Sequence, residues 1–275
     1  NYLKEYIHLN LKDEKEYLSF IDLIKGADIL LSNFKNGDAE KLKLTDDILR
    51  KINPKLIIGK ISGFGSSSDR VAYDLILQAE TGFMSMNGTK DSGPVKMPVA
   101  LIDVLAAHQL KEGLLIALIE RLNSNIGKTV SVSLYDAAIC SLSNQASNYL
   151  MSGHIAQRIG SLHPNIAPYG ELFETANGDL ITFAIGSDSH FRKLCEFLKT
   201  PELLEDARFE SNVDRVINRD VLQKRIQDKI IELPTIFILE TMHKQFVPAG
   251  KVQNLKEVFD QPDALELVRT ESINS

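Results

Sequence analysis

Cysteine is scarce in this sequence, because only Cys140 and Cys195 occur among 275 residues, far apart and each within an apolar stretch. Neither has a second cysteine at Cys-x-x-Cys spacing or a histidine at ligand spacing, which argues against a metal site. Two separate thiols fit a reducing compartment. We therefore expect both side chains to be buried as small hydrophobic groups.

Long apolar runs are also absent. No uninterrupted stretch approaches the ~20 residues that cross a bilayer. The first residues, Asn1 to Glu5, lack the basic and then apolar profile of a signal peptide. These absences lead us to expect a protein of the cytoplasm or of an organelle matrix that does not bind a membrane.

A strong excess of positive charge is missing too. The 31 Lys and Arg residues face 37 Asp and Glu residues, for a net charge of -6. The basic residues are spread along the chain and form no stripe that could follow phosphates, so nucleic-acid binding is not expected. The sequence does contain 44% hydrophobic residues, enough for a substantial core in one or two lobes.

Helical and strand-like patterns alternate in the first half of the chain. The expected helices are 14–25, 45–52, 104–122 and 135–151, and the expected strands are 27–31, 55–61 and 129–134. Strands that alternate with helices predict an α/β fold with a parallel sheet and helices on its faces.

The texture changes after residue 153, where a loop rich in Gly, His and Pro begins. We expect a hairpin over 173–180, a strand over 181–185, helices over 189–198, 218–231 and 234–245, and a short helix that ends near Asp260. The predicted organisation is a large domain over 1–150, a linker over 151–163, a smaller α+β domain over 164–250 and a return toward the large domain over 251–275.

Two features of the first half could carry chemistry. A glycine turn, Ser62 to Gly65, follows a strand and lets backbone N–H groups approach a phosphate, although such a turn is often only a tight turn. Asp103 precedes a long apolar helix at the position of an N-cap, where the helix dipole would keep its carboxylate ionised. A nucleophilic aspartate must be ionised, but taken alone Asp103 is equally well an ordinary cap.

Nine stretches, in order along nearly the whole chain, together resemble the family III CoA-transferases, also called the CaiB/BaiF family. They are residues 27–34, 61–65, 72–79, 81–85 with 87–88, 102–103, 132–138, 144–150, 163–169 and 247–250. The stretch His163-Pro164-Asn165-Ile166-Ala167-Pro168-Tyr169 is most similar to members that use succinate and other short dicarboxylic acids. Arg158 and His163 could therefore meet a second carboxylate, although an ordered interdomain loop is the plainer interpretation.

The resemblance implies a Rossmann-like large domain and a small domain in an interlocked homodimer, with coenzyme A bound as an acyl-CoA substrate and no metal. It implies that Asp103 attacks the donor thioester, giving an aspartyl anhydride and then an aspartyl-CoA thioester, which a carboxylic acid acceptor resolves. The coenzyme A contacts that it implies are Lys4, Asn33, Phe34, Lys41, Ser62, Gly63, Phe64 and Gly65, with Tyr73 near the thioester. The family domain begins before the stretches found here, so we expect its N-terminal part to be absent from this chain.

Three alternatives remain open. The 2-methylacyl-CoA racemases of the same family use a His and Asp pair to move a proton, but this chain has Tyr73 where they carry the His. A non-catalytic CoA-binding relative would share the fold, although Asp103, the glycine turn and Tyr73 together weigh against it. A Rossmann dehydrogenase would need a Gly-x-Gly-x-x-Gly motif between a strand and a helix, which the sequence lacks.

Overall fold

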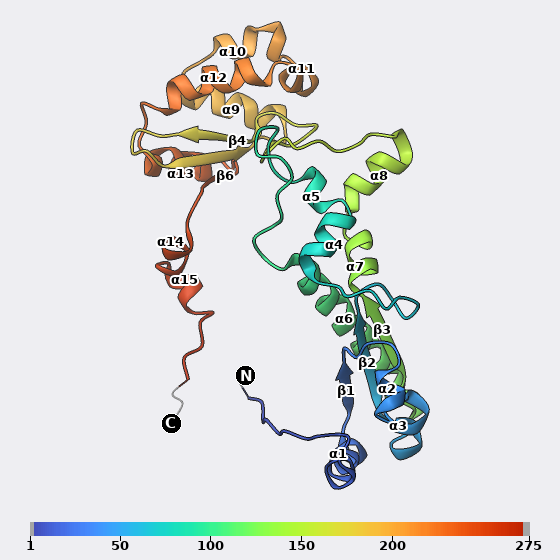
Figure 1. Cartoon of the computed structure of the whole chain (residues 1–275). Helices are drawn as coiled ribbons and strands as arrows, with labels where there is room; N and C mark the ends of the chain where they lie inside the picture. The colour runs from blue at the N-terminus through green and yellow to red at the C-terminus, as the bar shows by residue number, and fades with distance from the viewer. Residues whose placement is uncertain (1–2, 272–275) are drawn as a thin grey trace. The chain divides into compact units, whose positions relative to one another are not determined.

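The computed structural model describes residues 3–271 (Figure 1). The chain divides into two compact units, with the boundary between Arg158 and Ile159. We call residues 3–158 the first unit and residues 159–271 the second unit. No described helix is both long and apolar enough to cross a membrane.

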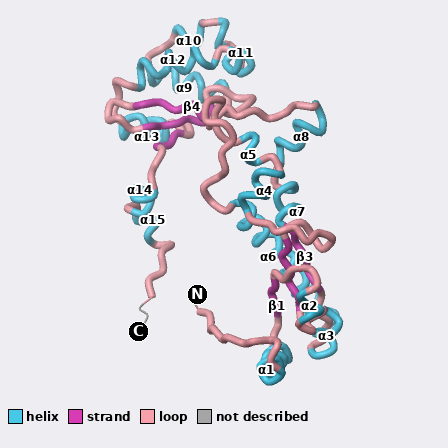
Figure 2. Tube along the Cα trace, in the orientation of Figure 1, coloured by secondary structure: helices cyan, strands magenta, loops and turns pink. Residues whose placement is uncertain are grey.

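The first unit is built on three parallel strands, β1 (Ile29–Ser32), β2 (Ile57–Ser62) and β3 (Thr129–Ser133), in the order β1-β2-β3. They lie side by side in Figure 2. Helices run between them, so the expected mixed α/β fold with a parallel sheet is confirmed. Helix α1 (Glu14–Gly26) begins at Asp13, whose side chain accepts two backbone N–H groups, and α2 (Asp38–Lys41) and α3 (Asp46–Ile52) follow β1.

Helices cover both faces of β2. Ile58 packs with residues of α1 and α3, whereas the next residue, Gly59, faces α6 (Leu101–Ser124). A Cβ atom at Gly59 would lie 3.2 Å from Leu114, and one at Gly113 would lie 2.5 Å from Val130. The two glycines therefore let α6 lie close against the sheet.

The remaining helices of the first unit are α4 (Asp74–Glu80), α5 (Phe83–Met86), α7 (Leu134–Cys140) and α8 (Ser143–Ser152). One continuous helix over 135–151 was expected, and this is wrong, because Ser143 adopts a left-handed φ of 49° that interrupts it. The expected burial of both cysteines is also wrong, because Cys140 ends α7 exposed to solvent.

The second unit holds three antiparallel strands, β4 (Tyr169–Glu174), β5 (Leu180–Ala184) and β6 (Ala249–Lys251), in the order β4-β5-β6. Its longer helices are α9 (Asp188–Leu198), α12 (Arg219–Ile230) and α13 (Thr235–Lys244), close to the expected ranges. Shorter helices are α10 (Glu202–Glu205), a 3-10 turn (Ala207–Phe209), α11 (Asn212–Ile217), α14 (Leu255–Phe259) and α15 (Pro262–Leu265). Cys195 is buried in this core, and desolvation raises the pKa of its thiol to about 12.

Candidate functional site

Two adjoining cavities lie at the carboxyl end of the parallel sheet, where open α/β sheets bind ligands. The first is about 540 Å³ and the second about 280 Å³. They share six lining residues, namely Phe34, Lys35, Asn36, Ile61, Ser62 and Gly65. The loop after β1 and the glycine turn after β2 therefore contribute residues to the walls of both cavities.

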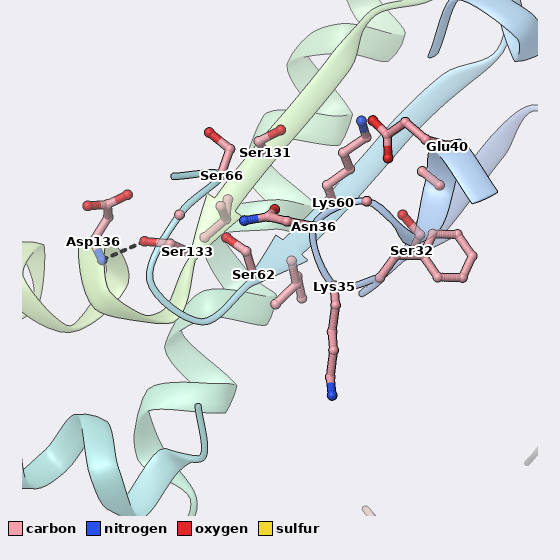
Figure 3. Close-up of a pocket in the computed structure, with 16 residues that line it drawn as sticks. Ser32, Lys35, Asn36, Glu40, Lys60, Ser62, Ser66, Ser131, Ser133 and Asp136 are labelled. Carbon is pink, nitrogen blue, oxygen red and sulfur yellow. Dashed lines mark hydrogen bonds between the residues drawn. The ribbon is translucent and has the colours of Figure 1, made fainter. Parts of the chain in front are cut away.

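The first cavity has a polar wall that the strand register creates. Lys60 is the partner of Ser32 on one side and of Ser131 on the other, while Ser62 is the partner of Ser133. Partners in register point to the same face of a sheet, so hydroxyl groups from three strands and one ammonium group line the same wall. Figure 3 shows these side chains around the cavity, which Glu40 also lines.

Lys60 is anchored by Asp46 of α3, with 2.6 Å between Nζ and Oδ1. Partial burial opposes ionisation of Asp46, but hydrogen bonds from Lys60 and Thr129 outweigh it and lower the pKa of this carboxyl. Asp46 is thus held as an anion that fixes the ammonium group at the cavity wall. Lys35 from the loop after β1 adds a second cation to both cavities.

The second cavity depends on the glycine turn. A Cβ atom on Gly63 would lie 2.2 Å from the Cβ of Ala72, so only glycine lets this turn meet the segment that leads to Tyr73. Gly65 has a φ of +86°, a left-handed conformation that glycine adopts without strain. Arg70 lies 4.1 Å from the centre of the Phe64 ring and pairs with Glu80 at 2.5 Å. The guanidinium is thereby positioned at the cavity wall.

Asp103 is the third residue of α6, and the helix begins after Ala100. The expectation that Asp103 is the N-cap is therefore wrong. Ala100 provides no capping side chain, and the backbone N–H of Ile102 donates instead to Asp74 Oδ1, at 2.7 Å. A carboxylate from α4 supplies the cap, so the helix can start earlier than local sequence suggests.

The electrostatics of Asp103 also differ from the expectation that the helix dipole keeps it ionised. Partial desolvation and the nearby Asp74 carboxylate raise the pKa of Asp103 above its ordinary value. The side chain is exposed, and no hydrogen bond or ion pair joins its carboxylate to another residue within the described range 3–271. Asp103 thus presents an unpaired carboxylate whose anionic form is destabilised.

The structure brings together most of the residues predicted to contact coenzyme A. Asn33, Phe34, Ser62, Gly63, Gly65 and Tyr73 line one or both cavities. Phe64 lies under Arg70 instead, with its ring 6.0 Å from that of Tyr135.

Besides Phe64, three predicted site residues line neither cavity. Lys41 is exposed and pairs with Asp38 at 3.2 Å, one residue after Glu40 of the cavity wall. Lys4 is exposed in the segment before α1. Asp103 follows Ile102, whose backbone N–H donates to Asp74, and the residue before Asp74, Tyr73, lines the second cavity.

Arg158 and His163 belong to different units. Arg158 donates a hydrogen bond to the backbone oxygen of Ser85, at 3.1 Å. His163 accepts one from the backbone of Asn165 through Nδ1 at 3.1 Å, and its ring lies 5.0 Å from that of Tyr169. Both side chains already have partners within their own unit.

Sequence reasoning missed Lys60, Arg70 and the serines of β3 as cavity residues. The signal for the serines was present, since Ser131 and Ser133 alternate along a strand and must share a face. Lys60 could not be placed without the register of β2 and β3. The described residues contain no group of three or more His, Cys, Asp or Glu side chains that could hold a metal ion.

Comparisons with known proteins complete the description. The family described as CoA-transferase family III matches residues 1–273. The chain is 35% identical to the succinate–glutarate CoA-transferase of Agrobacterium fabrum over 87% of this chain and 60% of that protein. It is 32% identical to the acetyl-CoA:oxalate CoA-transferase of Acetobacter aceti over 94% of this chain and 67% of that protein.

A solved structure shows the same fold. The crystal structure of a CaiB/BaiF family protein from Brucella suis superposes with a TM-score of 0.82 at 33% identity, covering 94% of this chain and 69% of that one. The chain spans about 60% of the length of the Agrobacterium relative.

Proposed function

The chain belongs to CoA-transferase family III, and from that premise we propose that it moves coenzyme A from a dicarboxylyl-CoA such as succinyl-CoA to a second short carboxylic acid. The observation that carries the proposal is Asp103, an exposed and unpaired carboxylate at the start of α6. Relatives named for succinate, glutarate, oxalate and mesaconate support the choice of short dicarboxylic acids.

The two cavities fit the coenzyme A part of the substrate. Its phosphates need cations and hydrogen-bond donors, and the walls offer Lys35, Lys60 and Arg70 together with serine hydroxyl groups. Tyr73 at the edge of the second cavity adjoins Asp74 and so leads from the coenzyme A site toward Asp103. We assign Asn33, Phe34 and the turn from Ser62 to Gly65 to the same site, and Lys41 and Lys4 as outlying contacts.

The proposed reaction begins with attack by an Asp103 carboxylate oxygen on the thioester carbonyl. The C–S bond breaks, coenzyme A leaves as a thiolate, and Asp103 is left in a mixed anhydride with the donor acyl group. The thiolate then attacks Cγ of Asp103, which releases the donor acid as a carboxylate and forms an aspartyl-CoA thioester.

The second half repeats these steps in reverse with the acceptor. The acceptor carboxylate attacks Cγ of Asp103, the thiolate leaves, and a new mixed anhydride forms. Attack of the thiolate on the acyl carbon of the acceptor yields the new acyl-CoA and restores the Asp103 carboxylate. No water and no redox partner takes part, so every bond that breaks is balanced by one that forms.

Trapping tests this proposal directly. The protein is incubated with succinyl-CoA and hydroxylamine, which converts an activated carboxylate to a hydroxamate, and peptides are mapped by mass spectrometry. We expect the modification at Asp103 only when the donor is present. Hydroxamate on other carboxylates alone would contradict the assignment, and deuterium exchange at the alpha carbon of a 2-methylacyl-CoA in its place would point to a racemase.

We also propose that the protein is a homodimer. Helix α6 carries apolar side chains that are 52–78% exposed, namely Leu115, Ile116, Ile119 and Leu122. An exposed apolar stripe of this kind is typical of a surface that another chain covers. Light scattering at micromolar concentration should give the mass of two chains, and a single-chain mass would overturn the proposal.

A further inference from the structure

A buried polar pair lies beneath the first turn of α6. Asp74 and Gln78 stand four residues apart on α4 and so share one face of that helix. Asp74 is 8% exposed and Gln78 is fully buried. The Nε2 group of Gln78 donates to Asp74 Oδ2 at 2.6 Å, and Oδ1 of the same carboxylate accepts the N–H of Ile102 at 2.7 Å.

Asp74 and Gln78 together hold the start of α6 and the segment that precedes it. The N–H of Ile102 is one of the first backbone donors of the helix, which have no partner inside the helix. Gln78 Oε1 accepts the N–H of Met97 at 2.8 Å, so the segment that enters α6 is held by the same side chain that orients Asp74. Ile102 is fully buried between α4 and α7, and this fixes the rotation at which the next residue, Asp103, faces outward.

The charge of Asp74 is not needed for this cap. An asparagine oxygen could accept the same N–H, and burial of a neutral amide costs less than burial of a carboxylate. The charge does act on Asp103, whose pKa it raises together with partial desolvation. Repulsion between two carboxylates disappears when one of them is acylated, because an anhydride or a thioester is neutral.

Other charged groups lie on α6 and around it. The elements packed against this helix carry Lys60, Asp74, Glu80 and Asp136, and besides Asp103 the helix itself carries His108, Lys111, Glu112, Glu120 and Arg121. Lys60 pairs with Asp46, Glu80 with Arg70, and His108 lies 3.1 Å from Lys111. Of these charges, the one that shifts Asp103 is that of Asp74.

We propose that Asp74, braced by Gln78, is a positioning residue for Asp103: it fixes the first turn of α6 and its charge favours the acylated over the ionised state of Asp103. The inference rests on the proposed role of Asp103 as the group that is acylated. It assigns to α4 a part in the reaction although Asp74 lines neither cavity.

The test compares three variants of the protein. Asp74→Ala removes both cap and charge. Asp74→Asn keeps an oxygen for Ile102, but it removes the charge and the second oxygen, which accepts from Gln78. Asp13→Ala is the matched control, because Asp13 caps α1 in the same unit through the N–H groups of Lys15 and Glu16 and lines neither cavity.

Two measurements need no turnover. Hydrogen exchange at the first turn of α6 should become about tenfold faster in Asp74→Ala, change less in Asp74→Asn, which keeps the acceptor for Ile102, and stay unchanged in Asp13→Ala. A ¹³C NMR titration of the Asp103 carboxyl should show its midpoint at lower pH in Asp74→Asn, because the like charge that raises it is gone. Unchanged exchange in Asp74→Ala together with an unchanged midpoint in Asp74→Asn would overturn the proposal.

Kinetics then show whether this positioning serves the reaction. We expect Asp74→Ala to lower kcat by about tenfold or more with little change in KM for the acyl-CoA, and Asp74→Asn to recover much of that loss. Equal kcat values in Asp74→Ala and Asp13→Ala would also overturn it. If the wild-type protein gives no hydroxamate at Asp103, the proposed function fails while the exchange and NMR results still decide whether Asp74 holds the turn.

Discussion

Asp74 in the first unit and Arg215 in the second are buried charged side chains, and their surroundings differ. Arg215 in the second unit is 1% exposed, and all three of its nitrogens bond within the unit, to the backbone oxygens of Ala167, Phe209 and Glu210 and to Asp188. Its guanidinium also lies 4.5 Å from the ring centre of Phe191. Asp74 in the first unit is bonded as well, but its charge also acts on Asp103, whose carboxylate has no hydrogen-bond or ion-pair partner among residues 3–271.

The hydrophobic cores of the two units also differ. Sixteen buried side chains of the second unit form one continuous core. The described part of the first unit divides its core into clusters of six and five buried residues, on either side of a sheet that ends in cavities. The comparison indicates that the charge of Arg215 is compensated within its own unit, whereas the charge of Asp74 also acts on a second carboxylate, that of Asp103.

The largest expected effect is a loss of transfer rate, without a loss of stability, when Asp103 is replaced. Asp103→Asn should reduce CoA transfer by about 10³-fold or more, because an amide cannot form the anhydride. The free energy of unfolding should change by less than about 0.5 kcal/mol, since the side chain is exposed and unpaired. Initial rates with succinyl-CoA and urea titration provide the two readouts.

The matched control for this change is Asp47→Asn. Asp47 is another exposed aspartate in the first turn of a helix of the same unit, and it lines neither cavity. It should leave both rate and stability unchanged. A transfer rate in Asp103→Asn equal to that of Asp47→Asn would contradict the proposal that Asp103 is the reacting carboxylate.

At Arg215 the expected effect of a substitution is a loss of stability. Arg215→Met should destabilise the second unit by about 3 to 5 kcal/mol, because three backbone oxygens lose a donor in a buried place. Guanidinium titration should show the loss. Arg225→Met, which removes an exposed arginine whose distance to Glu202 is 3.8 Å, should stay within about 0.5 kcal/mol of the wild type. Equal stability of the two variants would mean that Arg215 does not stabilise its unit.

The smallest expected effect concerns the glycine turn of the first unit and the KM for the acyl-CoA. Gly63→Ala places a methyl group 2.2 Å from the Cβ of Ala72, so the turn must shift, at a cost of about 1 to 3 kcal/mol. Because the turn and Tyr73 line the second cavity, KM for the acyl-CoA should rise several-fold while Asp103 chemistry persists. Gly26→Ala meets nothing within 4 Å and serves as the control. A KM equal in both variants would show that the turn does not contact the substrate.

Much of the fold could be predicted from the sequence because local patterns determine it. The expected strands at 55–61 and 129–134 agree with β2 and β3 to within two residues at either end, since apolar and alternating runs specify them. Helices α10 and α11 were missed, because four and six residues are too short to show a helical period. The break between α7 and α8 depends on the backbone of Ser143, which no periodicity reveals.

The candidate site was less predictable because its key contacts are not local. The N-cap assignment of Asp103 failed because the cap is a carboxylate 28 residues earlier in the chain. The wall of Ser32, Lys60 and Ser131 exists only through the pairing of three strands. Sequence patterns identify which residues are polar, whereas the register and the docking of α4 decide which of them meet.

The hydrogen bond from Ile102 of α6 to Asp74 of α4 depends on the order in which the chain folds. Asp74 can cap Ile102 only after the two helices have docked, because a long loop separates them. In a nascent or partly unfolded chain Asp103 is therefore an aspartate like any other, with an ordinary acidity and no directed neighbour. The pKa of Asp103 therefore rises above its ordinary value only when α4 has docked against α6.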